Sequence, residues 1–356
     1  MEVNSKDEVK LPPARAIVPG TYFTVDWHCK TDPKYIHSFL SHAHSDHIAG
    51  IGSFRPPRVL HCTPITAKIM LLKYPKLSKC IQVHEYSSEF IIEAITIRII
   101  NANHTPGSCM FLFETPLGRK ILHTGDFRAD STLIESISRF CPVNQLYIDC
   151  TYATSKLLFL SRKECIDWTI ERVIENMKSN TLTMIGTYTL GKEELVLAIS
   201  NKLNIPIYAP EERYNGISEM IKCGYCSQSC FTNDPTKTSV YLTPIMDCNN
   251  TSAGIWAKEH GYSSVCAIAA TGWSGKAGWK NPQIMYENGI KVTMYEVPYS
   301  DHSSPQELIN FVKVVKPKKL VSTTSRSQKE EEKIQKMFLP YIRKEKNRGF
   351  IDFYTK

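Results

Sequence analysis

Short apolar stretches alternate with polar loops along the first part of the chain. The stretches at 35–40, 94–100, 120–122 and 145–148 are rich in β-branched and aromatic residues, which favour strands, and a similar stretch follows at 291–297. Apolar and polar positions alternate most clearly in 94–100 (AITIRII), as expected of a strand that buries one face. These segments predict several short strands.

The middle of the chain changes to a strand–helix pattern. An amphipathic helix is expected over 162–177, a strand over 181–185 and a second helix over 192–203. Such alternation is typical of a unit with parallel strands. Further on, Ser304 and Glu307 enclose a proline in a capping-box pattern, which predicts that a helix begins there. The pattern as a whole predicts the α/β class.

Length and composition fit a globular protein with more than one core. The 356 residues favour two domains or one domain with an insertion, and 42% hydrophobic with 22% charged residues excludes a disordered chain. No apolar run could span a membrane, and residues 1–13 lack the apolar stretch of a secretory signal, so an intracellular protein is expected. The net charge of +8 permits a polyanionic partner without identifying one.

The 12 cysteines are scattered, which favours reduced thiols over a disulfide framework. Cys223, Cys226 and Cys230 have the spacing of a zinc knuckle, and Cys248 is the nearest fourth ligand. Because closed zinc sites need four ligands, ordinary thiols are the preferred interpretation and a structural zinc is the alternative.

Polar residues that follow the predicted strands indicate a metal site. The segment SHAHSDH contains His42, His44, Asp46 and His47 directly after the first strand. Other strands run into His104, Asp126, Asp149 and the pair Asp301–His302. Strands that each deliver a metal-binding type of side chain at one end describe a site at the rim of a sheet.

The spacing within SHAHSDH suits two ions. His42 and His44 are two residues apart, so in an extended segment they point to the same side and can bind one ion. Asp46 and His47, turned by the start of a helix, can face a second ion.

Two downstream residues, His104 and Asp126, raise the candidates to six, enough for a dinuclear centre in which Asp126 bridges. The alternative is a surface cluster or a set of core histidines. That structural role is expected of the histidines that stand alone, which are His28, His37, His61, His84 and His260.

The order of the motifs resembles the metallo-β-lactamase/β-CASP nucleases, and within them the DNA cross-link repair branch that includes Artemis and Apollo. The resemblance covers about 19–324 and rests on HxHxDH, FTVD (23–26), ANHTPG (102–107), HTGDFR (123–128), LYIDCTY (146–152), GTYTLGKE (186–193) and PYSDHSS (298–304). It implies an αββα metallo-β-lactamase sandwich built from 1–155 and 280–356, with a β-CASP α/β domain inserted at 156–279.

The resemblance also implies roles for single residues. Zinc would be held by His42, His44, His104 and Asp126, and a second, weaker divalent ion by Asp46 and His47. Asp26 would orient the ligand histidines from outside the metal shell. Asp46, Asp149 and His302 would be catalytic. By their chemistry, Asp149 could orient a ligand or polarise the attacking water, and His302 could donate to a scissile oxygen or protonate the leaving oxygen. The alternative for His302 is a structural position beside the helix N-cap.

One departure from the family pattern favours DNA over RNA as the substrate. RNA-cutting relatives carry a further ligand histidine in the segment that matches 320–325, where this chain has Thr324 at the best-aligned position. The second metal would therefore lack one protein ligand.

The segment GTYTLGKE matches most of a Walker A loop, but Glu193 replaces the hydroxyl residue that holds magnesium, which excludes an NTPase. The helix predicted to begin in this segment could still bind an anion such as phosphate, because backbone N–H groups at a helix N-terminus are free to donate. By resemblance, Tyr152, Thr187 and Ser303 would lie near a terminal 5′-phosphate, whereas Lys192 is expected to be a solvated charge or a helix-face residue.

The segment WSGKAGWK (273–280) interleaves aromatic rings with cations. Trp273 and Lys276 could stack on bases and neutralise phosphates of DNA. A tryptophan buried beneath a loop is the alternative.

The sequence thus predicts a zinc-dependent phosphodiesterase. The preferred function is a 5′-to-3′ DNA exonuclease that requires a 5′-phosphate and acts in interstrand cross-link or double-strand break repair. Alternatives are an Artemis-like structure-specific endonuclease, an RNA-processing β-CASP nuclease and a non-catalytic DNA-binding scaffold. A nuclear, monomeric protein with no membrane partner is expected.

Overall fold

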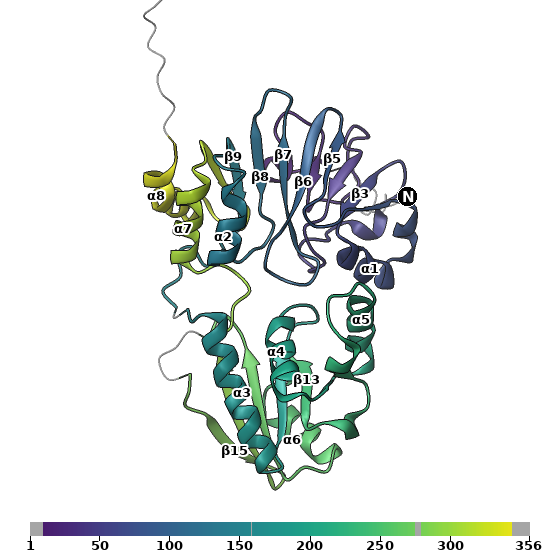
Figure 1. Ribbon diagram of the computed structural model, residues 1–356, viewed down its shortest axis with the longest axis vertical. Helices are drawn as coiled ribbons and strands as arrows, with labels where there is room; N and C mark the ends of the chain where they lie inside the picture. Colours follow the sequence, from purple (N-terminus) through teal and green to yellow (C-terminus); the bar gives the residue numbers. More distant parts are fainter. Residues whose placement is uncertain (1–9, 158, 275–278, 344–356) are drawn as a thin grey trace, which may run out of the picture.

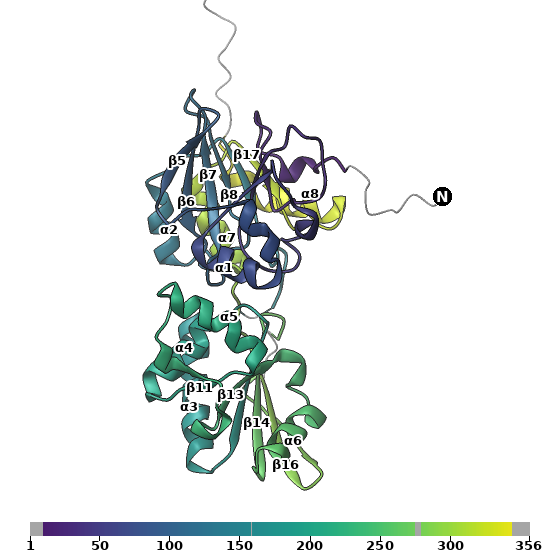
Figure 2. The ribbon, with the colours of Figure 1, turned by 90° about the vertical axis from the view of Figure 1, so that its right-hand side faces the viewer.

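The computed structural model describes residues 10–157, 159–274 and 279–343. It has two lobes (Figure 1). The upper lobe contains both ends of the described chain, purple to blue and yellow in the figure, and the lower lobe contains the teal and green middle. Figure 2, turned by 90°, shows the same division. The middle of the chain is thus an insertion into the upper lobe.

Two sheets lie face to face in the upper lobe. The first has four parallel strands in sequential order, β1 (Thr24–Val25), β2 (His37–Phe39), β3 (Val59–Cys62) and β4 (Ile81–Val83). The second has six strands in the order β17 (Lys319–Ser322), β9 (Gln145–Ile148), β8 (Lys120–His123), β7 (Cys109–Glu114), β6 (Ile95–Asn101) and β5 (Glu89–Ile92). Because β17 pairs with β9, the sheet joins segments from both sides of the insertion.

Aromatic side chains fill the space between the two sheets. Phe39 of β2 packs against Phe111 and Phe113 of β7, and all three rings are fully buried. Helix α1 (Pro64–Lys73) packs on the outer face of the first sheet. Helices α2 (Ser131–Ser138), α7 (Pro305–Val315) and α8 (Gln328–Phe338) cover the second sheet. These four layers confirm the predicted αββα sandwich.

The lower lobe is built on a seven-stranded sheet. Its order is β12 (Phe231–Thr232), β11 (Ile207–Tyr208), β13 (Val240–Pro244), β10 (Leu182–Thr187), β14 (Ser264–Ala270), β16 (Ile290–Val297) and β15 (Gln283–Glu287), and only the β15–β16 pair is antiparallel. Helices α3 (Arg162–Lys178), α4 (Glu193–Leu203) and α5 (Glu211–Lys222) share one apolar core with this sheet, and α6 (Asn250–Glu259) belongs to a second core. The predicted strand–helix alternation is confirmed.

The sheet pairing moves one expected domain boundary. A boundary between 279 and 280 would separate β14 from β15 and β16, yet β14 and β16 pair over their whole length. Since strands of one continuous sheet fold as a unit, we propose that the inserted domain runs to Val297.

Local sequence rules account for where several helices begin. Ser304 and Glu307 form the predicted capping box of α7, and Ser161 with Glu164 forms a second one at α3. In the described part of the chain, no helix is both long and apolar enough to cross a bilayer.

Candidate metal centre

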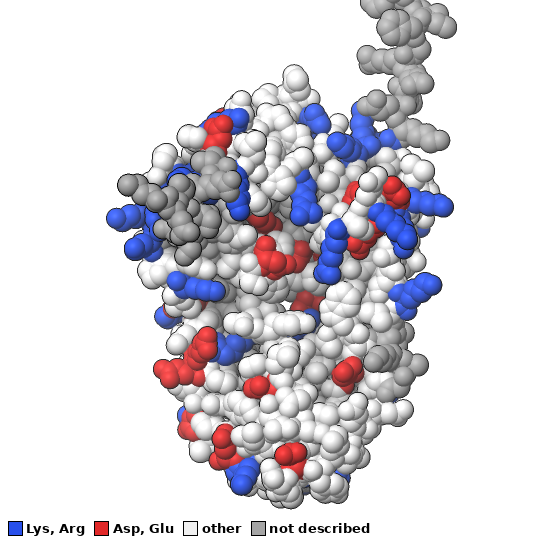
Figure 3. Space-filling view, turned by 180° about the vertical axis from the view of Figure 1, so that it is seen from behind, with Lys and Arg blue, Asp and Glu red and all other residues white. Residues whose placement is uncertain are grey.

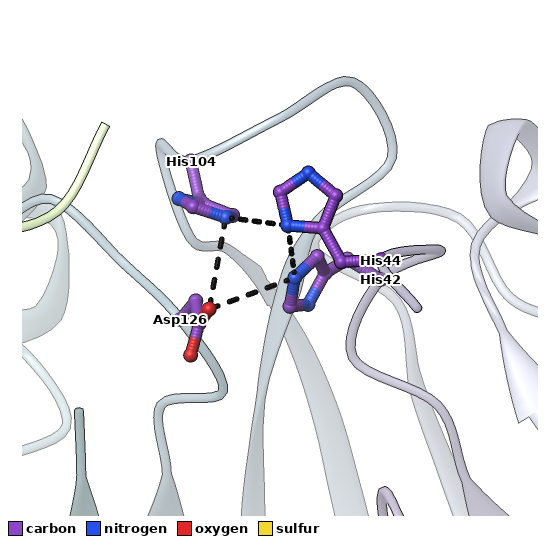
Figure 4. A group of neighbouring side chains, drawn as sticks. All are labelled: His42, His44, His104 and Asp126. Atoms are coloured by element: carbon purple, nitrogen blue, oxygen red, sulfur yellow. Dashed lines mark hydrogen bonds and ion pairs between the residues drawn. The ribbon is translucent and has the colours of Figure 1, made fainter. Parts of the chain in front are cut away.

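Four side chains from three loops meet at one end of the second sheet. His42 and His44 follow β2, His104 follows β6 and Asp126 follows β8. His42 Nε2 lies 3.0 Å from His44 Nδ1, and His104 Nε2 lies 3.3 Å from the same atom (Figure 4). Asp126 Oδ2 is 3.7 Å from His42 Nε2 and 3.8 Å from His104 Nε2. The four donor atoms all lie within 4.8 Å of one another.

Each histidine turns its other ring nitrogen toward a protein oxygen. These contacts are His42 Nδ1 to Ser41 Oγ at 2.9 Å, His44 Nε2 to the Leu190 carbonyl at 3.0 Å and His104 Nδ1 to the Asp301 carbonyl at 3.0 Å. A carbonyl can only accept, so His44 and His104 are protonated on these outer nitrogens when neutral. The inner nitrogens are then free to act as metal ligands.

A second group of donors shares Asp126. Its other oxygen, Oδ1, lies 3.3 Å from His47 Nε2, and Asp46 Oδ2 lies 3.7 Å from that nitrogen. The Asp46 side chain is 76% exposed and belongs to a turn, not to the start of a helix as expected. The second group therefore offers only three protein donors, one of them on the surface.

Asp26 and Gly125 contact the histidine segment 41–47 on the side away from the metal ligands. Asp26 Oδ2 accepts from His47 Nδ1 at 2.7 Å and from Ser41 Oγ at 2.7 Å, and Ser41 in turn contacts His42. Gly125 has φ +54°, and a Cβ there would lie 2.6 Å from Ser41 Cβ. Only glycine lets this loop approach Ser41 so closely.

Burial controls the protonation of the cluster. It lowers the pKa of His42 and of His104 well below the ordinary value, so both rings are neutral at pH 7, the form that binds metals. Burial would also lower the pKa of His47, but Asp126 and Asp26 outweigh it and raise that pKa. Three neutral imidazoles and one carboxylate fit the ligand set of zinc.

Asp149 and His302 form a pair beside the metal cluster. Asp149 follows β9 and His302 precedes α7, and Asp149 Oδ2 lies 2.7 Å from His302 Nδ1. Burial opposes the charge on His302, but Asp149 raises its pKa to about 9. His302 therefore carries a proton at neutral pH.

A cleft of about 1590 Å³ between the lobes opens onto these residues. Seen from behind, acidic side chains lie in the hollow and Lys and Arg side chains lie around it (Figure 3). The cations that line the cleft are Arg15, Lys73, Lys192, Arg213, Lys222 and Arg326. Trp273, 56% exposed, and Tyr152 also line it, with ring centroids 4.9 Å apart.

Two expected phosphate contacts do not reach this cleft. Thr187 is buried, and its hydroxyl donates to the Tyr188 carbonyl. Ser303 is also buried, and its hydroxyl donates to the Phe127 carbonyl and accepts from the Ala129 amide. Both hydroxyls bind backbone groups in this structure, and a phosphate contact by either residue stays a prediction. Lys276 lies outside the described residues.

Lys192 is not the solvated charge that was expected. It is 5% exposed, and its Nζ lies 2.9 Å from Asp301 Oδ2. The isolated sequence gives no sign of this ion pair because the two residues are more than a hundred positions apart.

Three of the histidines expected to stand alone are in contact with one another. His61 lies 3.0 Å from both His37 and His84, nitrogen to nitrogen, across neighbouring segments of the first sheet. They do not form a metal site, because among the described residues the groups able to share an ion contain none of them.

The cysteine cluster shows no metal geometry either. All 12 cysteines are free thiols, and the potential metal groups found in the described chain include no cysteine. Cys230 is buried and its Sγ lies 3.5 Å from Asn201 Oδ1. The thiol interpretation therefore fits Cys223, Cys226 and Cys230 better than the structural zinc.

Comparison with known proteins gives matches to DNA repair proteins. Residues 225–328 match the family model described as DNA repair metallo-beta-lactamase. The chain is 32% identical to the human DNA cross-link repair 1A protein, over 86% of this chain and 30% of that protein. It is 29% identical to the DNA cross-link repair protein SNM1 of Arabidopsis thaliana, over 96% of this chain and 72% of that protein. The chain is also 29% identical to the 5′ exonuclease Apollo of Danio rerio, over 86% of this chain and 51% of that protein.

The chain spans about 30% of the length of the vertebrate cross-link repair 1A proteins that it matches. The match nevertheless covers both parts of the sandwich and the inserted domain. The resemblance inferred from the motifs is thus confirmed, and the chain belongs to the DNA cross-link repair branch of the metallo-β-lactamase/β-CASP family.

Proposed function

We propose that this protein is a zinc-dependent DNA nuclease that hydrolyses phosphodiester bonds from a 5′-phosphorylated end in the 5′-to-3′ direction. The observation that carries the proposal is the convergence of His42, His44, His104 and Asp126 at the cleft, with the Asp149–His302 pair beside them. Metal ligands next to a proton donor are the groups that phosphodiester hydrolysis requires.

Zinc fits the first donor group. Bound there, it would supply Lewis acidity to an attacking water and to the charge that develops on the phosphate. Asp126 has one oxygen toward each donor group, so it is the residue suited to bridge two ions. The second group, Asp46, His47 and Asp126, has three donors instead of four, so an ion there would be held more weakly.

His302 is suited to act as the general acid. Its Nδ1 is held by Asp149, which leaves Nε2 to donate a proton to the leaving oxygen. The His302 and Tyr152 rings lie 5.9 Å apart, so Tyr152 would pack beside the reacting phosphate and help to position it. Trp273, further along the same wall, would stack on a base of the DNA strand.

A comparison of DNA ends tests the proposed polarity. We expect a 5′-phosphorylated, 3′-labelled oligonucleotide to be shortened stepwise from its 5′ end, and a matching 5′-hydroxyl oligonucleotide to be cut much more slowly. Equal cleavage of both ends would contradict the exonuclease proposal. Cleavage of a hairpin with blocked ends would instead favour the structure-specific endonuclease.

The position of Thr324 favours DNA over RNA. Its hydroxyl accepts from the Cys150 amide, and the side chain offers no imidazole to a second ion. An RNA oligonucleotide of the same sequence is therefore expected to be a poor substrate. A role in interstrand cross-link or double-strand break repair also belongs to the proposal, and the names of the relatives support the cross-link role. A nuclear location would follow from such a role, and a monomeric state stays a prediction.

A further inference from the structure

Backbone carbonyls on both sides of the lobe boundary hold the outer nitrogens of two metal-site histidines. The Leu190 carbonyl, which binds His44 Nε2, belongs to the inserted domain, between β10 and α4. The Asp301 carbonyl, which binds His104 Nδ1, lies in the segment that leads back from β16 into the sandwich. The His44 contact could not form in the sandwich lobe by itself, because Leu190 belongs to the inserted domain.

A buried cluster of charges fixes both carbonyls. Lys192 Nζ lies 2.9 Å from Asp301 Oδ2 and donates to the Tyr299 carbonyl at 3.3 Å. Lys192 is only two residues from Leu190, in a turn where Gly191 has φ +114°. The ion pair therefore connects the turn that contacts His44 with the residue that contacts His104.

Arg162, the first residue of α3, completes the cluster. Its Nη2 lies 3.3 Å from Asp301 Oδ1 and donates to the Asn103 carbonyl at 2.8 Å, and its Nη1 donates to Asn103 Oδ1 at 2.6 Å. Asn103 directly precedes His104. Arg162 thus holds the His104 loop by its backbone as well as through Asp301.

The charges in this cluster compensate one another. Burial would raise the pKa of Asp301, but Lys192 and Arg162 outweigh it and lower that pKa, so the carboxylate is ionised. Removing one cation leaves the buried carboxylate only partly compensated, which loosens the segment that carries it.

We propose that the inserted domain is part of the metal centre. Lys192 and Arg162 act as positioning residues that hold Asp301 and the Leu190 turn, and through them set the orientation of His104 and His44. Loss of either cation should weaken metal binding, and metal binding should in turn tighten the contact between the lobes. This inference rests on the metal site of the proposed function.

Zinc affinity tests the coupling directly. Dissociation constants are measured by competition with a chromophoric chelator for the wild-type protein, Lys192→Met and Arg162→Met. Because partners of metal-ligating histidines typically contribute 10- to 100-fold to affinity, we expect both variants to bind Zn²⁺ about 10-fold more weakly or worse. Lys192→Arg, which keeps the charge, should recover most of the affinity.

Arg172→Met is the matched control. Arg172 lies on the same helix and pairs with Glu175, and neither residue contacts the metal cluster. Its zinc affinity should equal that of the wild type. Wild-type affinity in Lys192→Met and Arg162→Met would overturn the coupling alone, since the wild type would still bind zinc and cut DNA. A wild type that binds zinc without cutting DNA would overturn the proposed function and leave the coupling standing.

Hydrogen exchange of the wild-type protein covers the case in which a variant does not fold. Adding Zn²⁺ to the metal-depleted protein should slow amide exchange in 188–193, on the inserted domain, as well as in the histidine loops. Slower exchange in the histidine loops with no change in 188–193 would overturn the inference.

Discussion

Asp149 Oδ2 and His302 Nδ1 lie 2.7 Å apart, although their residues come from opposite sides of the inserted domain. The carboxylate outweighs burial and raises the pKa of His302 to about 9, which keeps the imidazole charged beside the metal cluster. The two residues therefore work as one unit.

Replacing Asp149 with Asn should remove most of the nuclease activity without removing the first metal. Without the carboxylate, His302 loses the charge that keeps it protonated, and general acids typically contribute about 10²- to 10⁴-fold to rate. The kcat of the variant is measured on a 5′-phosphorylated oligonucleotide, and its zinc content by elemental analysis. Asp234→Asn, a partly exposed helix cap in the inserted domain, is the control and should keep full activity.

Replacing Asp46 with Ala should affect only the second ion. Asp46 is exposed and belongs to the three-donor group, whereas the first group keeps all four of its ligands. We expect the variant to bind one zinc with wild-type affinity and to lose cleavage while it retains DNA binding. Asp126→Ala, which removes a ligand from both groups, should lose both ions. Equal metal content in the two variants would contradict the bridging role of Asp126.

Gly125→Ala should disturb the metal site without touching a ligand. The added Cβ would lie 2.6 Å from Ser41 Cβ, and the positive φ of Gly125 is strained for any other residue. Ser41 would have to move, and with it the contacts to Asp26 and His42. We expect weaker zinc binding and a lower melting temperature. Gly118→Ala separates the effect of backbone strain from that of the clash with Ser41, because Gly118 also has a positive φ but has open space where its Cβ would lie. This control should have a lower melting temperature but unchanged zinc binding.

Trp273→Ala should weaken DNA binding. Stacking of one base on an aromatic ring is worth about 1–3 kcal/mol, so we expect Kd for single-stranded DNA to rise roughly 10-fold, measured by fluorescence anisotropy with a cleavage-inactive Asp149→Asn background. Tyr286→Ala removes a ring that is even more exposed than Trp273 but lies on β15, outside the cleft. An equal effect of both substitutions would argue against stacking at Trp273.

The chain of histidines in the first sheet predicts a loss of stability in acid. Burial lowers the pKa of His61 to about 3 and that of His84 to about 4, below the value of 6.5 in an unfolded chain. The unfolded state therefore takes up protons first. The stabilisation is complete above pH 6.5 and is lost as the pH falls toward 4.

The magnitude follows from linkage. Each proton taken up on unfolding lowers the free energy of unfolding by about 1.4 kcal/mol per pH unit. Urea unfolding in the presence of EDTA, from pH 7.5 to 4.5, measures this slope without the contribution of bound metal. His61→Gln should show a shallower slope than the wild type, and an unchanged slope would show that His61 does not titrate in this way.

Residues whose chemistry is concentrated in short motifs could be predicted from the sequence. His42, His44, Asp46 and His47 lie in one segment, and any fold that ends a strand there brings them together. His104 and Asp126 could be added because each follows a strand. The capping box of α7 was equally readable, since Ser304 and Glu307 interact within one turn.

Residues whose role depends on packing across the chain could not be predicted in this way. Lys192 looked solvated because charged residues usually are, and only the docking of the two lobes brings it to Asp301. The pairing of His37, His61 and His84 depends on the order of strands in the first sheet, which no local pattern specifies. The hydrogen bonds of Thr187 and Ser303 to backbone carbonyls could not be predicted either, because a motif does not tell which way a hydroxyl points.

The pairing of β17 with β9 also bears on how the protein is made. During translation, all six candidate ligands leave the ribosome within the first 126 residues, long before Asp301, His302 and β17 have been synthesised. A nascent or prematurely terminated chain can thus display the metal-binding segment while it still lacks the proton donor and the edge strand. The proposed proton donor can therefore join the metal-binding segment only after the whole inserted domain has been synthesised.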